Sequence, residues 1–220
     1  MRKLLIIILI IFLPLYFLLK SVDINTFNRN FYLNFYERYN VVEVTGKRID
    51  ELDQITRNLY SYIKGESVDE VLKPFFNERE IKHLEDVKVL FMYGFSLKKL
   101  SFALSLFGII IFFIYKDVVK FGQGIFYGTF IWWGLILLLL LSTMDFNKYF
   151  TCFHLIFFDN DLWLLDSDTD LLIQMLPEEF FISIFRRIVL LFMVILAIIQ
   201  LTGYILMKKG KDKSGRVIDF

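Results

Sequence analysis

Cysteine, proline and histidine are scarce in this sequence of 220 residues, which holds one Cys, three Pro and two His. A lone cysteine cannot form an internal disulfide, and it cannot supply the paired cysteines of a redox or metal-binding motif. Charge of one sign is not in excess either, since 25 Lys and Arg stand against 24 Asp and Glu. The composition therefore gives no indication of nucleic-acid binding.

Several catalytic and binding motifs are also missing. The sequence has no phosphate-binding loop, no glycine-rich dinucleotide fingerprint and no Gly-x-Ser-x-Gly element, so a serine-hydrolase mechanism has no support. The acidic stretch from Asp159 to Asp170 lacks the glycine turn and terminal glutamate of a calcium loop. The two histidines lack the spacing of a zinc motif, which leaves zinc a minor alternative. We therefore predict no cofactor and no metal.

Hydrophobic residues are abundant and lie in long runs. They make up 56% of the chain, against about 45–50% in ordinary globular proteins. Four runs, at residues 4–19, 100–115, 124–142 and 182–207, are about as long as a helix that crosses a bilayer. We therefore expect an α-helical membrane protein with four transmembrane helices. No small-residue cleavage site follows the first run, which indicates an uncleaved anchor.

The positions of the basic residues predict the orientation. Four spans place both termini on one side of the membrane, and three basic clusters share that side: Arg2 and Lys3; Lys116 and Lys120; and Lys208, Lys209, Lys211, Lys213 and Arg216. Because Lys and Arg near span ends favour the cytoplasm, we predict that both termini are cytoplasmic. Two basic pairs, Lys98-Lys99 and Arg186-Arg187, fall at the opposite interface, where they either snorkel into headgroups or hold a lipid phosphate.

The segments 20–99 and 143–181 are then extracytoplasmic and carry folding patterns of their own. Val41 to Gly46 reads as a short strand that ends in a turn. The apolar spacing over 49–63 predicts an amphipathic helix, and Asn77, followed by acidic residues, predicts the N-cap of a helix that runs toward the second span. We expect a single membrane domain with a small extracytoplasmic cap of mixed helix and short strand.

Both histidines, His83 and His154, fall on the extracytoplasmic side, each near a span. Histidine can accept and donate protons near neutral pH, so a pair assembled between two segments would suit acid–base catalysis. Asp86 lies three residues after His83, on the same helical face, and could orient its ring. Cys152 lies two residues before His154 and faces away on a helix, so we interpret it as a small apolar residue. Two polar residues on amphipathic helices remain the alternative reading.

Four segments that include these histidines resemble a known family. They are 83–88, which precedes a span, and 153–166, which each contain one histidine, and 170–173 and 177–181, which contain none. All four resemble the multi-pass membrane family that includes the bacterial lipoprotein intramolecular transacylase. The layout of spans is similar over nearly the whole chain. Ser167 departs from the family, which often has proline there; the departure affects a turn and leaves the histidines untouched.

The resemblance implies a membrane acyltransferase of the bacterial cell envelope. Such an enzyme moves the sn-2 acyl chain of a diacylglyceryl-cysteine lipoprotein onto the α-amino group of the same cysteine, giving an N-acyl lyso-lipoprotein. The active site would lie at the extracytoplasmic leaflet of the cell membrane. The partners would be the diacylated lipoprotein and membrane lipids, while the oligomeric state stays open.

The resemblance also implies roles for individual residues. His83 and His154 would form the acid–base pair. The supporting or substrate-binding residues would be Asp86, Lys88, Tyr39, Asp159, Asn160, Trp163 and Asp166. Asp86 would orient a histidine, Lys88 or Asn160 would hold the substrate or the developing oxyanion, and the two aromatics would line the pocket unless they only pack or anchor.

A non-enzymatic class competes with this reading, namely a membrane scaffold or accessory subunit that binds a partner through the cap. Transport is disfavoured because no charge falls near the middle of any span. An enzyme should lose activity on His83→Ala or His154→Ala, whereas a scaffold should tolerate both changes.

Overall fold

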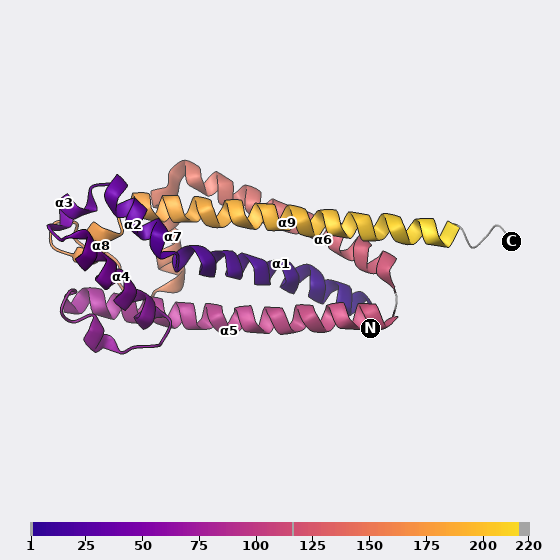
Figure 1. Ribbon diagram of the computed structural model, residues 1–220, viewed down its shortest axis with the longest axis horizontal. Coiled ribbons are helices and arrows are strands. Elements are labelled where there is room, and N and C mark those ends of the chain that lie inside the picture. The colour runs from indigo at the N-terminus through magenta and orange to yellow at the C-terminus, as the bar shows by residue number, and fades with distance from the viewer. Residues whose placement is uncertain (1, 116, 216–220) are drawn as a thin grey trace. The chain divides into compact units, whose positions relative to one another are not determined.

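The computed structural model describes residues 2–115 and 117–215, and every regular element in that part of the chain is a helix (Figure 1). Lys116 and Arg216, and the side chains of Arg2, Lys209, Lys211 and Lys213, lie outside the described part. In chain order the elements are α1 (Arg2–Thr26), α2 (Arg29–Arg38), α3 (Val41–Thr45), α4 (Ile49–Ile63), η1 (Asp69–Val71), α5 (Glu78–Tyr115), α6 (Val118–Leu141), η2 (Ser142–Asp145), α7 (Phe146–Phe157), α8 (Leu171–Met175) and α9 (Glu178–Gly215).

Four of the described helical segments are long and apolar enough to cross a membrane: Lys3–Thr26, Glu78–Tyr115, Val118–Phe157 and Glu178–Lys208. The prediction of four such helices is confirmed. The described residues form two compact units, one built from residues 2–22, 96–115, 117–141 and 187–215 and the other from residues 23–95 and 142–186. We call them the helical unit and the cap unit.

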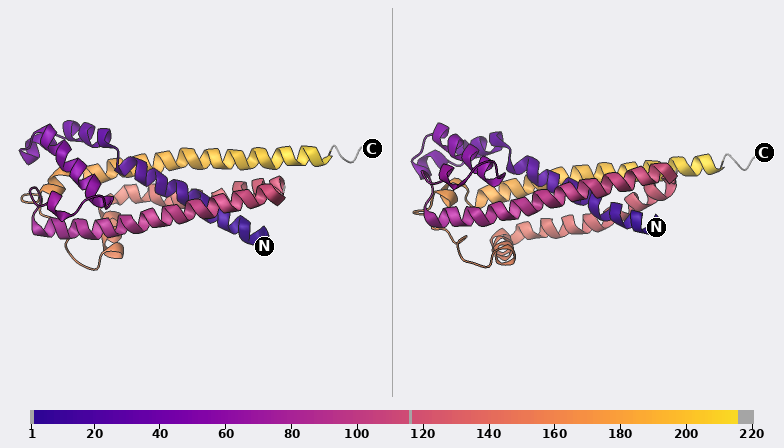
Figure 2. Two further views of the ribbon diagram at one scale, coloured as in Figure 1. Left: turned by 60° about the horizontal axis from the view of Figure 1, so that its bottom comes forward. Right: turned by 90° about the horizontal axis from the view of Figure 1, so that it is seen from below.

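Glycines let the helices of the helical unit approach closely. α6 and α9 lie side by side (Figure 2), and a Cβ atom added to Gly122 of α6 would lie 2.7 Å from the carbonyl oxygen of Gly203 on α9. On the other side of α6, the Ile10 side chain of α1 fills the space beside Gly128. Small residues at such contacts favour helix association in lipid, where apolar side chains gain little from leaving the solvent.

A hydrogen bond to Trp132 compensates for a proline inside α1. Pro14 has no backbone N–H, so it cannot donate to the carbonyl of Ile10 four residues earlier. The indole Nε1 of Trp132, on α6, donates to that carbonyl oxygen at 2.8 Å. The backbone polar group is therefore satisfied by a side chain, as a helix in hydrocarbon requires.

The core of the cap unit forms between α2 and α4. The predicted amphipathic helix over 49–63 is confirmed as α4, which buries Leu52, Ile55 and Leu59 on one face. α2 contributes Phe35 and Tyr36 to the same unit. The apolar spacing of three and four residues is enough to place this face because it follows the helical period.

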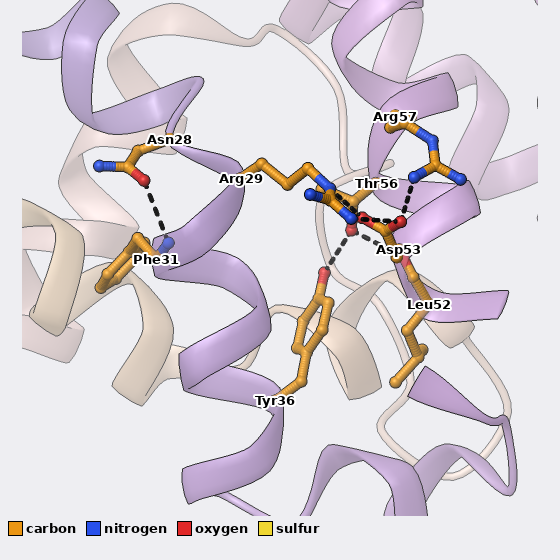
Figure 3. Close-up of polar contacts among 8 residues, drawn as sticks. All are labelled: Asn28, Arg29, Phe31, Tyr36, Leu52, Asp53, Thr56 and Arg57. Atoms are coloured by element: carbon orange, nitrogen blue, oxygen red, sulfur yellow. Dashed lines mark hydrogen bonds and ion pairs between the residues drawn. The ribbon is translucent and has the colours of Figure 1, made fainter. Parts of the chain in front are cut away.

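A polar cluster closes the same contact (Figure 3). The carboxylate of Asp53 accepts hydrogen bonds from the guanidinium groups of Arg29 and Arg57, and the bond from Arg29 holds the pKa of the Asp53 carboxyl below its usual value. Beside it, the hydroxyls of Tyr36 and Thr56 lie 2.8 Å apart. Burial raises the pKa of the Tyr36 hydroxyl, which keeps it neutral in this hydrogen bond.

The strand predicted for Val41 to Gly46 is wrong. Val41–Thr45 forms the short helix α3, and no strand occurs in the described residues. Asn40 and Gly46 flank it with left-handed backbone, at φ values of 53° and 64°, and the Thr45 hydroxyl donates to the Val41 carbonyl oxygen at 2.7 Å. These local bonds satisfy the backbone within one helical turn, so the cap is helical and has no short strand.

Candidate active site around two histidines

The two histidines lie together in the cap unit. His83 is on the second turn of α5, and His154 is near the end of α7. Their ring centroids are 6.1 Å apart, and the ring planes make an angle of 32°. Both residues are buried, with 8% and 7% of their surface exposed. A pair separated by 71 positions in the sequence is thus assembled by the fold.

The residues of α7 explain why His154 faces inward. Asp145 caps the helix by accepting a hydrogen bond from the backbone N–H of Lys148. Phe146, Phe150 and His154 follow at intervals of four, which places them on one face of the helix. The ring of Phe150 packs 5.0 Å from that of Phe181, at the start of α9. The aromatic stripe therefore holds the His154 side of α7 against the start of α9, within the cap unit.

One hydrogen bond fixes the proton on the His154 ring. Nδ1 of His154 lies 2.7 Å from the carbonyl oxygen of Phe150. A carbonyl oxygen can only accept, so Nδ1 carries the proton in this bond and Nε2 of the neutral ring keeps its lone pair. The ring of Trp163 stacks on the same imidazole, 4.7 Å away and at 28°. His154 is thus held both in its ring plane and in its tautomer.

His83 sits in an apolar surrounding. The Phe158 ring lies 5.5 Å from His83 and 5.5 Å from His154. Nδ1 of His83 is buried, and within the described residues it has no hydrogen-bond partner. A buried donor or acceptor without a partner is rare in proteins, and in this respect His83 differs from His154, whose Nδ1 is hydrogen-bonded.

Asn160 links the loop after α7 to α5. Its side-chain Nδ2 donates to Oδ2 of Asp86 at 2.9 Å, and its backbone carbonyl oxygen accepts a 3.0 Å hydrogen bond from Nε1 of Trp163. Asp86 is thereby connected, through Asn160 and Trp163, to the ring of His154. The direct pairing of Asp86 with His83 stays a prediction.

Lys88 and Tyr39 contact other parts of the cap unit. Nζ of Lys88 donates to the carbonyl oxygen of Ser67 at 3.3 Å and lies 4.0 Å above the ring of Tyr62. Tyr39 is the C-cap residue of α2; its ring stacks on that of Phe35 at 4.2 Å, and 41% of its surface is exposed. The contacts described for these two residues are therefore not with the histidines.

Asp159 and Asp166 lie exposed on the loop between α7 and α8. Oδ1 of Asp166 accepts a hydrogen bond from the backbone N–H of Asp168, which shapes a turn. Arg79 of α5 donates to the carbonyl oxygen of Asp161 and so holds the loop to the helix. Within the described residues no group of three or more His, Cys, Asp or Glu is placed to hold a metal ion.

Sequence reasoning did not single out two buried acids that organise this region, Glu80 and Asp170. Asn77 and Glu80 form a capping box, because Oδ1 of Asn77 accepts from the Glu80 N–H and Oε2 of Glu80 accepts from the Asn77 N–H. The predicted N-cap is thus confirmed. Oε1 of Glu80 also accepts from the N–H of Leu172 at 2.6 Å, and Oδ1 of Asp170 accepts from Nδ2 of Asn77 at 2.7 Å. These bonds join α8 to the start of α5.

A comparison with protein families places the chain. The family model described as lipoprotein intramolecular transacylase Lit matches residues 7–181. The chain belongs to the lipoprotein intramolecular transacylase family. The family resemblance that we inferred from four sequence segments is confirmed. The prediction that the protein is an acyltransferase is confirmed as well.

Solved structures agree with this family on the fold. The chain is 21% identical to the membrane-integral lipoprotein intramolecular transacylase Lit from Bacillus cereus, with a TM-score of 0.85 over 96% of this chain and 98% of that one. Two variants of that protein, with one histidine replaced by arginine or by alanine, each give 21% identity and a TM-score of 0.76; coverage is 97% and 96% of this chain and 95% and 96% of theirs. No curated protein matches the sequence. The four apolar helices and the family membership together indicate that the present transacylase is also a membrane-integral protein.

Proposed function

We propose that this transacylase moves the sn-2 acyl chain of a diacylglyceryl-cysteine lipoprotein onto the α-amino group of the same cysteine, giving an N-acyl lyso-lipoprotein. The observation that carries the proposal is the pair of buried imidazoles 6.1 Å apart in an aromatic surrounding. The amine nitrogen attacks the ester carbonyl, the C–N bond forms and the C–O bond to glycerol breaks. The proton lost by nitrogen ends on the glycerol oxygen, so atoms and charges balance without water or a second substrate.

His154 is the base in this scheme, and His83 supplies a proton. The Nδ1–H of His154 is engaged with Phe150, which leaves the Nε2 lone pair to accept the amine proton. His83 faces it and can donate a hydrogen bond to the developing oxyanion. The proton that His154 accepts passes through the imidazole pair to the departing alkoxide, so that both rings end neutral. Because donor and acceptor belong to one molecule, correct orientation removes much of the entropic barrier. The aromatic surrounding excludes the water that would hydrolyse the ester.

The supporting residues act on this pair or on the substrate. Asp86, Asn160 and Trp163 position the His154 ring through the contacts described above. The exposed carboxylates of Asp159 and Asp166 favour the approach of the positively charged cysteine terminus. Lys88 and Tyr39 form part of the cap surface that meets the lipoprotein, a role that rests on the family resemblance.

The site faces the extracytoplasmic leaflet in this proposal. Residues 4–19, 100–115, 124–142 and 182–207 cross the membrane, both termini are cytoplasmic, and residues 20–99 and 143–181 form the outer cap. The basic clusters near the span ends and the acidic loop after α7 support this orientation. It also places the histidines on the side where diacylated lipoproteins are anchored.

Mass spectrometry of the N-terminal lipopeptide tests the reaction. Three bacterial strains are compared: one that makes the wild type, one that lacks the protein and one that makes the His154→Ala variant. The presence of the variant in the membrane is confirmed. Only the wild type should shift one acyl group from glycerol to nitrogen while the total mass stays the same. Loss of a positioned acid–base group should cost about 10²–10⁴-fold in rate. An unchanged diacyl lipopeptide in the wild-type cells would overturn the proposal.

A further inference from the structure

The outer surface of α7 is apolar and exposed. Leu155, Ile156 and Phe157 have 67%, 76% and 52% of their surface accessible, and Phe153 and Tyr149 are 43% and 47% exposed. Next to this surface, the stripe of Phe146, Phe150 and His154 is less exposed, and His154 is buried. The helix therefore buries its catalytic imidazole and presents hydrocarbon outward, the reverse of a water-facing helix.

The limits of this surface coincide with charged residues. Between Lys148 and Asp159 the sequence contains no Asp, Glu, Lys or Arg. Tyr149 and the phenylalanines carry the aromatic character that is enriched where protein crosses from hydrocarbon to headgroup. A partner protein would ordinarily meet a polar rim and hydrogen-bonding groups around such a core, whereas lipid tails require only the apolar surface.

The chain leading into α7 is continuous with a membrane helix. η2 (Ser142–Asp145) follows α6 without a break, and the segment Val118–Phe157 as a whole is apolar enough to count as one candidate span. Because the protein is integral to a membrane, the bilayer is the apolar phase that this helix meets first. Because α7 follows a candidate membrane span directly in the chain, lipid is the occupant that we argue for on the exposed face.

We propose that α7 is an interfacial helix whose exposed face, formed by Tyr149, Phe153, Leu155, Ile156 and Phe157, lies against the acyl chains of the bilayer and sets the depth of His154. Interfacial helices bury an apolar face at the boundary between headgroups and acyl chains. The glycerol ester of a lipoprotein lies at that same boundary. This part of the inference rests on the proposed function: a base on the inner face of α7 meets the sn-2 ester without the lipid leaving the leaflet.

The single cysteine provides the test. Cys152 is exposed on α7, and a nitroxide attached to it in detergent can be carried into lipid nanodiscs with the full-length protein. Collision of the nitroxide with oxygen, which concentrates in hydrocarbon, is compared with collision with a water-soluble nickel chelate. The matched control is Cys152→Ser with Ser167→Cys, which moves the label to the exposed loop. The proposal expects oxygen to dominate at position 152 and the nickel chelate to dominate at position 167. Nickel access at both positions would overturn it.

A charge substitution gives an independent readout. Ile156→Glu introduces a good helix former on the proposed lipid face, and Val68→Glu is the control because Val68 is also apolar and 64% exposed in the cap unit. Ile156→Glu should increase collisions of the nitroxide at Cys152 with the nickel chelate relative to oxygen, and it should lower the conversion of a diacylated lipopeptide. Val68→Glu should change neither quantity. Equal, negligible effects of both substitutions would contradict the lipid contact. If the depth result holds but wild-type protein does not convert the lipopeptide, the proposed function fails and the interfacial helix stands.

Discussion

The imidazole of His154 is held by contacts from three directions. The Phe150 carbonyl oxygen accepts a hydrogen bond from its Nδ1–H, Trp163 covers one face, and the Phe158 ring lies 5.5 Å away between centroids. Trp163 itself is fixed by its bond to Asn160. A ring held in this way needs little reorganisation to receive a proton, which is the advantage of a preorganised site.

Substitution of Trp163 tests this positioning. An aromatic pair contributes about 0.5–1.5 kcal/mol, so Trp163→Ala should lower kcat by up to about tenfold and change the pH profile of kcat, because the surroundings of the base change. Trp163→Phe keeps a stacking ring but loses the hydrogen bond to Asn160, so its kcat should lie between those of the wild type and Trp163→Ala. The pH–rate profiles of all three proteins on a diacylated lipopeptide make the comparison. A lowered thermal midpoint with unchanged kcat and pH profile would assign Trp163 to structure alone.

The composition made the two histidines visible, since only two exist and both fall on one predicted side of the membrane. Their separation could not be predicted, because it depends on how α5 and α7 pack. Glu80 and Asp170 were missed for the same reason. Asn77 followed three residues later by Glu80 is a capping-box pattern that sequence reasoning could have read, but the bond from Leu172 to Glu80 spans 92 positions and has no local signal.

At the scale of elements, periodicity succeeded where one face is buried. The spacing in 49–63 predicted α4 residue for residue. The strand predicted for Val41 to Gly46 was wrong. Its β-branched residues favour a strand, but a strand also needs a neighbouring strand with which to pair. The left-handed Asn40 and Gly46 instead isolate a single helical turn. Local composition thus indicated the wrong element where the backbone at its two ends decided the conformation.

The contact between α2 and α4 should weaken in acid. The folded-state pKa of Asp53 is depressed, so its contribution to stability is complete above the unfolded pKa of about 3.9 and is lost as the pH falls through the lower folded value. Asp53→Asn should cost roughly 1–3 kcal/mol at neutral pH, and its deficit against the wild type should shrink below about pH 4. Thermal unfolding midpoints of both proteins across this range provide the measurement. A deficit that stays constant into acid would exclude the ion pair as its source.

At the scale of the whole chain, the glycines of the helical unit carry much of the helix packing. A Cβ atom at Gly203 would lie 2.8 Å from the backbone nitrogen of Phe126, so Gly203→Ala forces α6 and α9 apart. Overpacking of this kind costs about 1–3 kcal/mol and should lower the thermal midpoint in detergent. Gly134→Ala is the control, because nothing lies within 4 Å of its added Cβ atom. Equal midpoints for the two variants would show that the glycine contact contributes nothing.

The indole of Trp132 also has a consequence for how the protein is made. α1 leaves the ribosome before α6, carrying the Ile10 carbonyl to which Pro14 cannot donate, and the donor to this carbonyl lies 122 positions later. At about 5–20 residues per second, the polypeptide needs on the order of ten seconds to supply that donor. During this interval the Ile10 carbonyl must accept its hydrogen bond from water, lipid headgroups or the insertion machinery. Arrival of α6 therefore marks the moment at which the amino-terminal helix can settle in the bilayer.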